Sequence, residues 1–282
     1  MFELSVENSN GEILNFYSNP FYTVYKIEGL EPPKASLNFS EMANFDGSRY
    51  NSGRLENRNI VLYIKIHGNI ETNRINLYKY FAGKKLIKIY YKNKSRDVYE
   101  EGRVESFEIT PFSMNEIAQI SIICDNPYWR DAEETTTSFS NTFDLFEFPF
   151  SIAEEGIPFS EIGTLTTITI NNSEIETGFI ITLTAISNQI LNPKIVNRTN
   201  QTFFALNYDL KVGDVITINT QRNQKEVTLL RGGTKTNIIN YIAKGSTWLQ
   251  LEAGDNELSY ECDEGASNLK VVMTAVKCYE GV

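Results

Sequence analysis

The chain has 282 residues, 41% of them hydrophobic and 22% charged, and its formal net charge is −10. This length predicts two domains, each large enough to bury its own core, and the acidic balance argues against sequence-specific nucleic-acid binding. No apolar run reaches the roughly 20 residues of a membrane-spanning helix, and the N-terminal MFELSVENSN lacks the basic and apolar regions of a secretory signal. We therefore expect synthesis in a cytoplasm, without membrane insertion.

The first half of the chain alternates apolar and polar residues in short runs, as β-strands do. An Asn10-Gly11 step between two such runs predicts an early hairpin. Ile75 and Tyr78 recur at helical spacing and predict one helix over 71–81. The predicted strands are 2–7, 12–16, 22–30, 35–42, 58–68, 85–91, 98–101, 103–110 and 118–124. Strands with one helix across them predict an α+β domain.

Two polar segments interrupt these strands. The first, 43–57 (ANFDGSRYNSGRLEN), is rich in Gly, Asn and Ser and is predicted to be a loop. Loops of this length in compact domains are usually functional or mobile. The second, 92–97, is the predicted turn of a hairpin.

The stretch 103–131 marks the end of the first domain. Pro127 stops the last predicted strand because proline has no N–H for a sheet ladder. Tyr128 and Trp129 follow, and the chain then becomes acidic and rich in Thr. We therefore predict domains at 1–134 and 135–282, with 16 basic and 19 acidic residues in the first and 10 and 17 in the second, or net charges of −3 and −7.

The second half is almost entirely predicted strand. Turn residues such as Asn171-Asn172 and Gly232-Gly233 separate most of the runs, a spacing typical of an antiparallel β-sandwich with jelly-roll or Greek-key connections. The predicted strands are 164–170, 179–185, 194–197, 203–206, 214–219, 226–230, 247–251, 257–261 and 269–279. The whole chain is thus predicted to be mainly β.

The residue types that catalysis needs are sparse. His67 is the one histidine, so no histidine-based metal cluster can form, and we expect a structural role for it, either solvated or hydrogen-bonded. The three cysteines, at 124, 262 and 278, have neither disulfide nor zinc spacing. We expect no enzyme activity, no cofactor and no metal.

Two weaker signals leave alternatives open. The carboxylate pairs Glu252 with Glu261 and Asp144 with Glu147 fit a glycoside hydrolase, but such pairs also arise by chance in an acidic domain. Trp248 is a candidate carbohydrate contact, with core packing as the default alternative for an aromatic residue in a β domain.

Several stretches, taken in order, resemble the distal tail protein (Dit) family of long-tailed phages. In the first half they are Glu28-Gly29-Leu30, the strand RNIVLYIKIHG and the sequence DNPYW. In the second half they are GDVITINT, KEVTLLRGG, Ser246-Thr247-Trp248 and the final YEGV. Each is weak alone, but their order covers nearly the whole chain. The second domain has no long insertion, so the extra carbohydrate-binding modules of some family members are not expected.

The resemblance implies a homo-oligomer, a hexameric ring at the tail tip or baseplate of a virion or of a prophage-derived tail particle. The N-terminal domains would form the ring and continue the tail tube, with DNA passing through the opening. The tail tube protein would dock on one side and the tail hub or tail-associated lysin on the other. The C-terminal domain would be a galectin-like sandwich that supports a receptor-binding protein.

Within this picture the two polar segments become candidate ring or docking contacts, although ordinary solvated loops are an equal alternative. The candidate contact residues are Asn44, Asp46, Gly47, Arg49, Tyr50, Lys94 and Arg96. The second functional hypothesis is a carbohydrate-binding adhesin whose sandwich face binds cell-wall polysaccharide or capsular sugars through Trp248 and nearby Tyr residues, and a wall hydrolase is the third.

Overall fold

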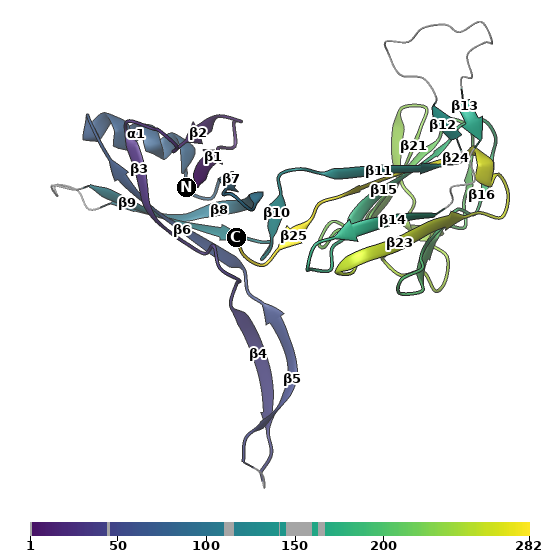
Figure 1. The fold of residues 1–282 in the computed structure, drawn as a ribbon, viewed down its shortest axis with the longest axis horizontal. Coiled ribbons are helices and arrows are strands. Elements are labelled where there is room, and N and C mark those ends of the chain that lie inside the picture. The colour runs from purple at the N-terminus through teal and green to yellow at the C-terminus, as the bar shows by residue number, and fades with distance from the viewer. Residues whose placement is uncertain (1, 44–45, 110–115, 141, 145–159, 163–166) are drawn as a thin grey trace, which may run out of the picture. The chain divides into compact units, whose positions relative to one another are not determined.

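A computed structural model describes residues 2–43, 46–109, 116–140, 142–144, 160–162 and 167–282 (Figure 1). The chain forms two compact units. The first unit contains Met1–Glu133 and Cys278–Val282, and the second unit contains Glu134–Lys277. The predicted domains, 1–134 and 135–282, differ from these units chiefly at the C-terminus, because the last five residues return to the first unit.

The first unit is built on a nine-stranded antiparallel sheet. Its order is β2-β1-β7-β8-β9-β6-β3, and β10 pairs with both β8 and β25. The strands are β1 (Glu3–Glu7), β2 (Ile13–Asn15), β3 (Tyr22–Glu28), β6 (Arg58–Ile66), β7 (Leu86–Lys92), β8 (Asp97–Ile109), β9 (Ile117–Cys124), β10 (Trp129–Asp131) and β25 (Cys278–Tyr279). The predicted α+β class is confirmed for this unit.

One helix, α1 (Ile70–Tyr80), packs on the core of this sheet. Its first turn is capped by Asn69, whose side chain accepts a hydrogen bond from the Thr72 amide, and Leu77 is fully buried. β8 is continuous where two strands, 98–101 and 103–110, were predicted. Gly102 lies at the join, where a Cβ would lie 2.7 Å from Ile122 Cγ2 of β9.

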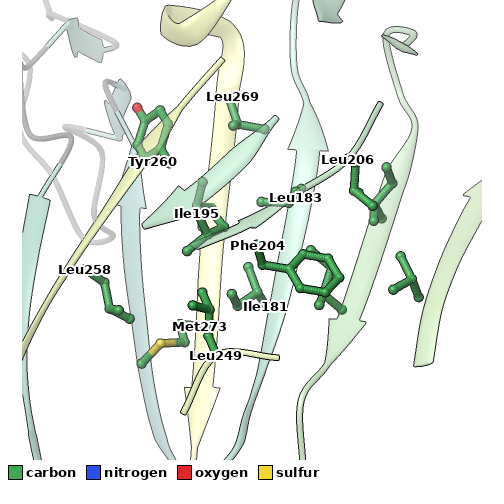
Figure 2. Close-up of a cluster of buried hydrophobic side chains, with 14 of the residues drawn as sticks. Ile181, Leu183, Ile195, Phe204, Leu206, Leu249, Leu258, Tyr260, Leu269 and Met273 are labelled. Carbon is green, nitrogen blue, oxygen red and sulfur yellow. The ribbon is translucent and has the colours of Figure 1, made fainter. Parts of the chain in front are cut away.

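The second unit is an antiparallel β-sandwich, as predicted. A six-stranded sheet, β11-β24-β15-β20-β21-β22, faces a four-stranded sheet, β14-β23-β17-β18. Ile181 and Met273 from the first sheet meet Ile195, Phe204 and Leu258 from the second in one buried cluster (Figure 2). The alternation of buried and exposed residues along β15 and β24 is the period of two that a half-buried strand requires.

The strands of the second unit are short. They are β11 (Thr135–Ser140), β12 (Thr142–Asp144), β13 (Ser160–Ile162), β14 (Thr167–Asn172), β15 (Phe179–Ala185), β16 (Ile190–Leu191), β17 (Lys194–Asn197), β18 (Thr202–Ala205), β19 (Asp209–Leu210), β20 (Val215–Asn219), β21 (Glu226–Arg231), β22 (Thr234–Asn237), β23 (Gly254–Glu261) and β24 (Leu269–Ala275). Two 3₁₀ turns, η1 (Ile239–Tyr241) and η2 (Ala266–Asn268), complete it.

Two strand predictions in this half are wrong. The segment 247–251 is not a strand, because its amides bond to isolated partners: Thr247 N–H donates to Phe203 O and Leu251 pairs only with Thr177. The predicted strand 269–279 divides into β24 in the second unit and β25 in the first. No helix among the described residues is long and apolar enough to span a membrane.

Candidate assembly interface: the β4–β5 arm and its base

A two-stranded hairpin leaves the sheet of the first unit between β3 and β6 (Figure 1). Its strands are β4 (Ala35–Glu41) and β5 (Ser48–Leu55), and we call it the arm. Every residue of the two strands is exposed except Leu55, which is half-buried. The prediction of a loop over 43–57 is therefore wrong for 48–55. Neither face of β5 packs on the core, so its sequence shows no burial pattern from which a strand could be predicted.

The arm has one apolar face. The register pairs Leu37 with Gly53 and Phe39 with Tyr50, so Leu37, Phe39 and Tyr50 share a side of the hairpin. The rings of Phe39 and Tyr50 meet edge to face with centroids 5.8 Å apart. These three side chains nevertheless remain 54%, 49% and 56% exposed. The other face carries polar side chains, among them Ser36 and Asn38.

The exposed apolar face indicates that the arm contacts a partner. An isolated two-stranded hairpin is marginally stable in water, because it has no third strand or helix on which to bury a face. Contiguous exposed apolar side chains on soluble proteins commonly mark interaction sites. Nothing in the described part of this chain covers Leu37, Phe39 and Tyr50.

The base of the arm is organised by one buried arginine. Arg58, the first residue of β6, is 2% exposed. Its Nη1 donates to the carbonyls of Gly29 and Glu31, at 2.5 and 2.8 Å. Its Nε and Nη2 both donate to Pro127 O, at 3.0 and 2.7 Å, and Nη2 also donates to Glu280 O at 2.5 Å.

Arg58 therefore joins the arm to the C-terminus of the chain. The acceptors lie in the segment 29–34 that leads into β4, in the turn after β9 and in the last five residues. Val282 N–H adds a bond to Leu30 O at 3.1 Å. Burial lowers the pKa of the guanidinium from its usual value. The four carbonyl dipoles replace the water that the charge has lost, and the Trp129 ring centroid lies 5.3 Å from Arg58 Cζ.

Gly29 fits its position for a steric reason. Its φ is +87°, and a Cβ there would lie 2.1 Å from the carbonyl oxygen of Asn59. Any side chain would push the base of the arm away from β6. Gly29, Pro127 and Glu280 belong to three of the stretches on which the family resemblance depends, and the structure brings them together around Arg58.

The structure places the predicted contact residues in two separate groups. Asp46, Gly47, Arg49 and Tyr50 are exposed at or near the tip of the arm. Asn44 lies outside the described residues. Lys94 and Arg96 lie in the turn between β7 and β8, where Lys94 is exposed. Arg96 is half-buried, with its Cζ 3.8 Å from the Tyr279 ring centroid, and so contacts the C-terminal strand.

Sequence reasoning missed Arg58 and the apolar face. The alternation of Leu37 and Phe39 was visible, but on a strand that alternation usually indicates a face turned to the core. The environment of Arg58 had no local signal, since its acceptors lie 27 to 222 residues away in sequence.

A shallow hollow lies beside the free edge strand β2. It has a volume of about 250 Å³. Its lining is Glu3, Leu4, Ser5, Ile13, Asn15, Tyr90, Lys92 and Asp97. The hollow thus combines apolar side chains with two carboxylates and one ammonium group.

The other candidate residues take structural positions. His67 Nε2 lies 3.0 Å from Thr23 Oγ1, which confirms its hydrogen-bonded role. Glu261 pairs with Lys194 at 3.0 Å. No three His, Cys, Asp or Glu side chains in the described ranges gather as metal ligands would. Trp248 is half-buried, with its ring centroid 5.1 Å from that of Phe204, and its role in carbohydrate binding stays a prediction.

The sequence matches two family models. Residues 9–145 match the phage tail protein RIFT-related domain, and residues 172–274 match the C-terminal domain of the siphovirus-type tail component. Together the two matches leave out only 1–8, 146–171 and 275–282. No curated protein matches the chain.

Solved structures share the fold over the full length. The crystal structure of the Dit protein of phage SPP1, described as a paradigm of the hub adsorption apparatus in phages of Gram-positive bacteria, matches with a TM-score of 0.69 and 11% identity, over 99% of each chain. A chain of the phage P2 baseplate in its activated conformation with Ca matches with a TM-score of 0.58 and 11% identity, over 100% of each chain. The same baseplate with Sr gives 0.55 and 12%, again over 100% of each chain.

Proposed function

Because the chain belongs to the siphophage distal tail protein family and is a structural component of the virion tail, we propose that it forms a hexameric ring at the tail tip. The ring would join the tail tube protein to the tail hub or tail-associated lysin, and DNA would pass through its opening. The second unit would support a receptor-binding protein. In this role the chain acts by assembly and has no enzymatic activity.

The uncovered apolar face of the arm is the observation that carries this proposal. Among the described residues, 12 exposed large hydrophobic side chains lie in the first unit and five in the second. The 12 are Phe2, Ile13, Tyr17, Phe21, Tyr25, Leu37, Phe39, Met42, Tyr50, Ile75, Tyr78 and Leu86. This distribution supports the first unit as the part that contacts its neighbours.

A closed ring needs two different surfaces on each copy, one that reaches out and one that receives. The arm supplies the first. The hollow beside β2 suits the second. It lies at one end of the strand path β2-β1-β7-β8-β10-β25, and the arm base lies at the other end, where Val282 N–H donates to Leu30 O. Its volume of about 250 Å³ suits an aromatic side chain such as Phe39, and its carboxylate Glu3 suits Arg49 of an incoming arm, whereas Asp97 already pairs with Lys92.

The test compares the two faces of the arm. We expect the purified wild-type chain, or tail particles that contain it, to show six-fold rings in negative-stain electron microscopy and a hexameric mass in light scattering. The triple variant Leu37→Ser, Phe39→Ser and Tyr50→Ser should remain monomeric, because it removes the apolar face. The matched control Ser36→Ala, Asn38→Ala and Ser52→Ala changes the polar face and should still form rings.

Two outcomes would contradict the proposal at different levels. Rings formed by the triple variant would show that the arm does not hold the copies together. The absence of six-fold rings from both purified protein and particles would overturn the ring itself. Asn15→Cys combined with Phe39→Cys then tests the hollow, since a disulfide between copies is expected if the arm of one copy enters the hollow of the next.

A further inference from the structure

The second unit has one exposed large aromatic side chain among its described residues. Tyr241, in η1, is 48% exposed. The other described aromatic residues of this unit, such as Phe204 and Trp248, are buried or half-buried. Tyr241 is therefore the described aromatic side chain of this unit whose ring is accessible to a ligand.

Tyr241 is part of a fixed cluster. Its ring meets the half-buried ring of Tyr208 edge to face, with centroids 4.9 Å apart and planes at 82°. Backbone bonds hold both residues in place: Asn207 N–H donates to Tyr241 O at 2.8 Å, and Asn192 N–H donates to Tyr208 O at 3.2 Å. The orientation of the aromatic surface is therefore set before any ligand arrives.

Arg231 adds hydrogen-bond donors beside these rings. Its Cζ lies 5.8 Å from the Tyr208 centroid. Nε and Nη2 donate to the two carboxylate oxygens of Asp214, at 2.8 and 2.5 Å, and Asp214 Oδ2 also accepts from Lys211 N–H at 2.7 Å. The Asp214 side chain is 3% exposed, whereas that of Arg231 is 41% exposed. The buried carboxylate, together with a side-chain hydrogen bond between Arg231 and Tyr208, thus fixes the guanidinium, and its five N–H groups exceed what these partners accept.

We propose that Tyr241, Tyr208 and Arg231 form a binding site for a neutral sugar ring. The apolar C–H face of a pyranose packs on an exposed aromatic ring, and its hydroxyls accept hydrogen bonds from a fixed guanidinium. Asp214 cancels the charge of Arg231, and the second unit carries 17 acidic and 10 basic residues, so an anionic ligand is disfavoured. This site differs from Trp248, whose ring packs on Phe204.

The experiment uses saturation-transfer NMR on the full chain with glucose, galactose and N-acetylglucosamine as separate probes. A concentration of about 10 mM suits the millimolar Kd of a single stacked sugar. We expect transfer to the ring protons of at least one probe. Tyr241→Ala should weaken binding about tenfold, and Tyr241→Phe should retain it because the ring remains.

Tyr50→Ala is the matched control, since Tyr50 is 56% exposed but lies on the arm of the first unit. It should leave the transfer unchanged. The proposal is overturned if no probe shows transfer, or if Tyr241→Ala binds as wild type while thermal melting shows it to be folded. If no sugar binds and Tyr241→Ala also stops the attachment of a tail protein to the particle, the site is a protein contact and the sugar assignment is wrong.

Discussion

The two units of this chain are both antiparallel β structures, yet they differ in which polar and apolar side chains they bury. The second unit buries its apolar residues between two sheets, and the one buried charged side chain among its described residues, Asp214, pairs with Arg231. The first unit exposes the apolar face of the arm and buries Arg58 and Glu100 at 2% and 0% exposure. The second unit thus buries its apolar cluster within itself, whereas the first unit leaves the apolar face of the arm exposed.

The buried ionisable groups of the first unit lie where distant segments meet. Arg58 joins the arm base, the turn after β9 and the C-terminus. Glu100 lies on β8, and its Oε1 is 3.3 Å from Nη2 of Arg130 on β10. Loss of either group should therefore affect the first unit and spare the second. Each unit has one tryptophan, Trp129 or Trp248, so a variant that lacks Trp248 allows unfolding of the first unit to be followed by fluorescence.

The largest effect is expected for Arg58→Met. Methionine fills much of the space but removes the donor shared by four carbonyls, of which that of Pro127 is bonded in a buried position, and this should lower the unfolding free energy of the first unit by about 4 kcal/mol. Urea unfolding followed by Trp129 fluorescence measures this. Arg198→Met, which removes a side chain that is 48% exposed, should change the stability of the second unit by less than about 0.5 kcal/mol. Equal effects of the two substitutions would show that the hydrogen bonds of Arg58 do not stabilise the first unit.

A smaller effect is expected for Gly29→Ala. The added Cβ would meet Asn59 O at 2.1 Å, and the φ of +87° is strained for alanine, so we expect a loss of about 3 kcal/mol in the first unit. Gly47→Ala is the control, because its φ of +92° is similar but no atom lies within 4 Å of the new Cβ. Its cost should be about 1 kcal/mol, from backbone strain alone. Similar losses in both variants would mean that the close approach at Gly29 contributes nothing.

The smallest effect is a pH dependence confined to the first unit. Burial raises the pKa of Glu100 to about 8, and this outweighs the opposing attraction of Arg130 and Arg58. The carboxyl of Glu100 also lies near the Cys124 thiol. Below pH 8 the folded unit keeps a proton that the unfolded chain, with an ordinary pKa near 4.5, has released. The unfolding free energy should therefore fall as pH rises, by about 2 kcal/mol between about pH 5.5 and about pH 7.

Glu100→Gln should flatten this pH dependence, because glutamine does not titrate. Glu108→Gln on the same strand should leave it unchanged, since the Glu108 side chain is exposed. Urea midpoints of the first unit at several pH values provide the measurement. A wild-type stability that rises from about pH 5.5 to about pH 7 would contradict the assigned direction.

The sequence alone determined the class of the protein and most of its elements. Alternation of apolar and polar residues located the strands, helical spacing located α1, and Gly232-Gly233 located the β21–β22 turn. These signals lie within a few residues of one another, so local reasoning can detect them.

Three features depend on long-range packing: β5 is half of an arm, β25 returns to the first unit, and Arg58 is buried among carbonyls. β5 packs on no core, and its strand conformation comes from pairing with β4. Cys278 and Tyr279 were predicted to end a strand of the sandwich, but in the structure they pair with Arg130 and Trp129 of β10 in the first unit. Arg58 meets acceptors 27 to 222 residues away. Such positions depend on long-range packing, for which the residues near Arg58 in the sequence contain no signal.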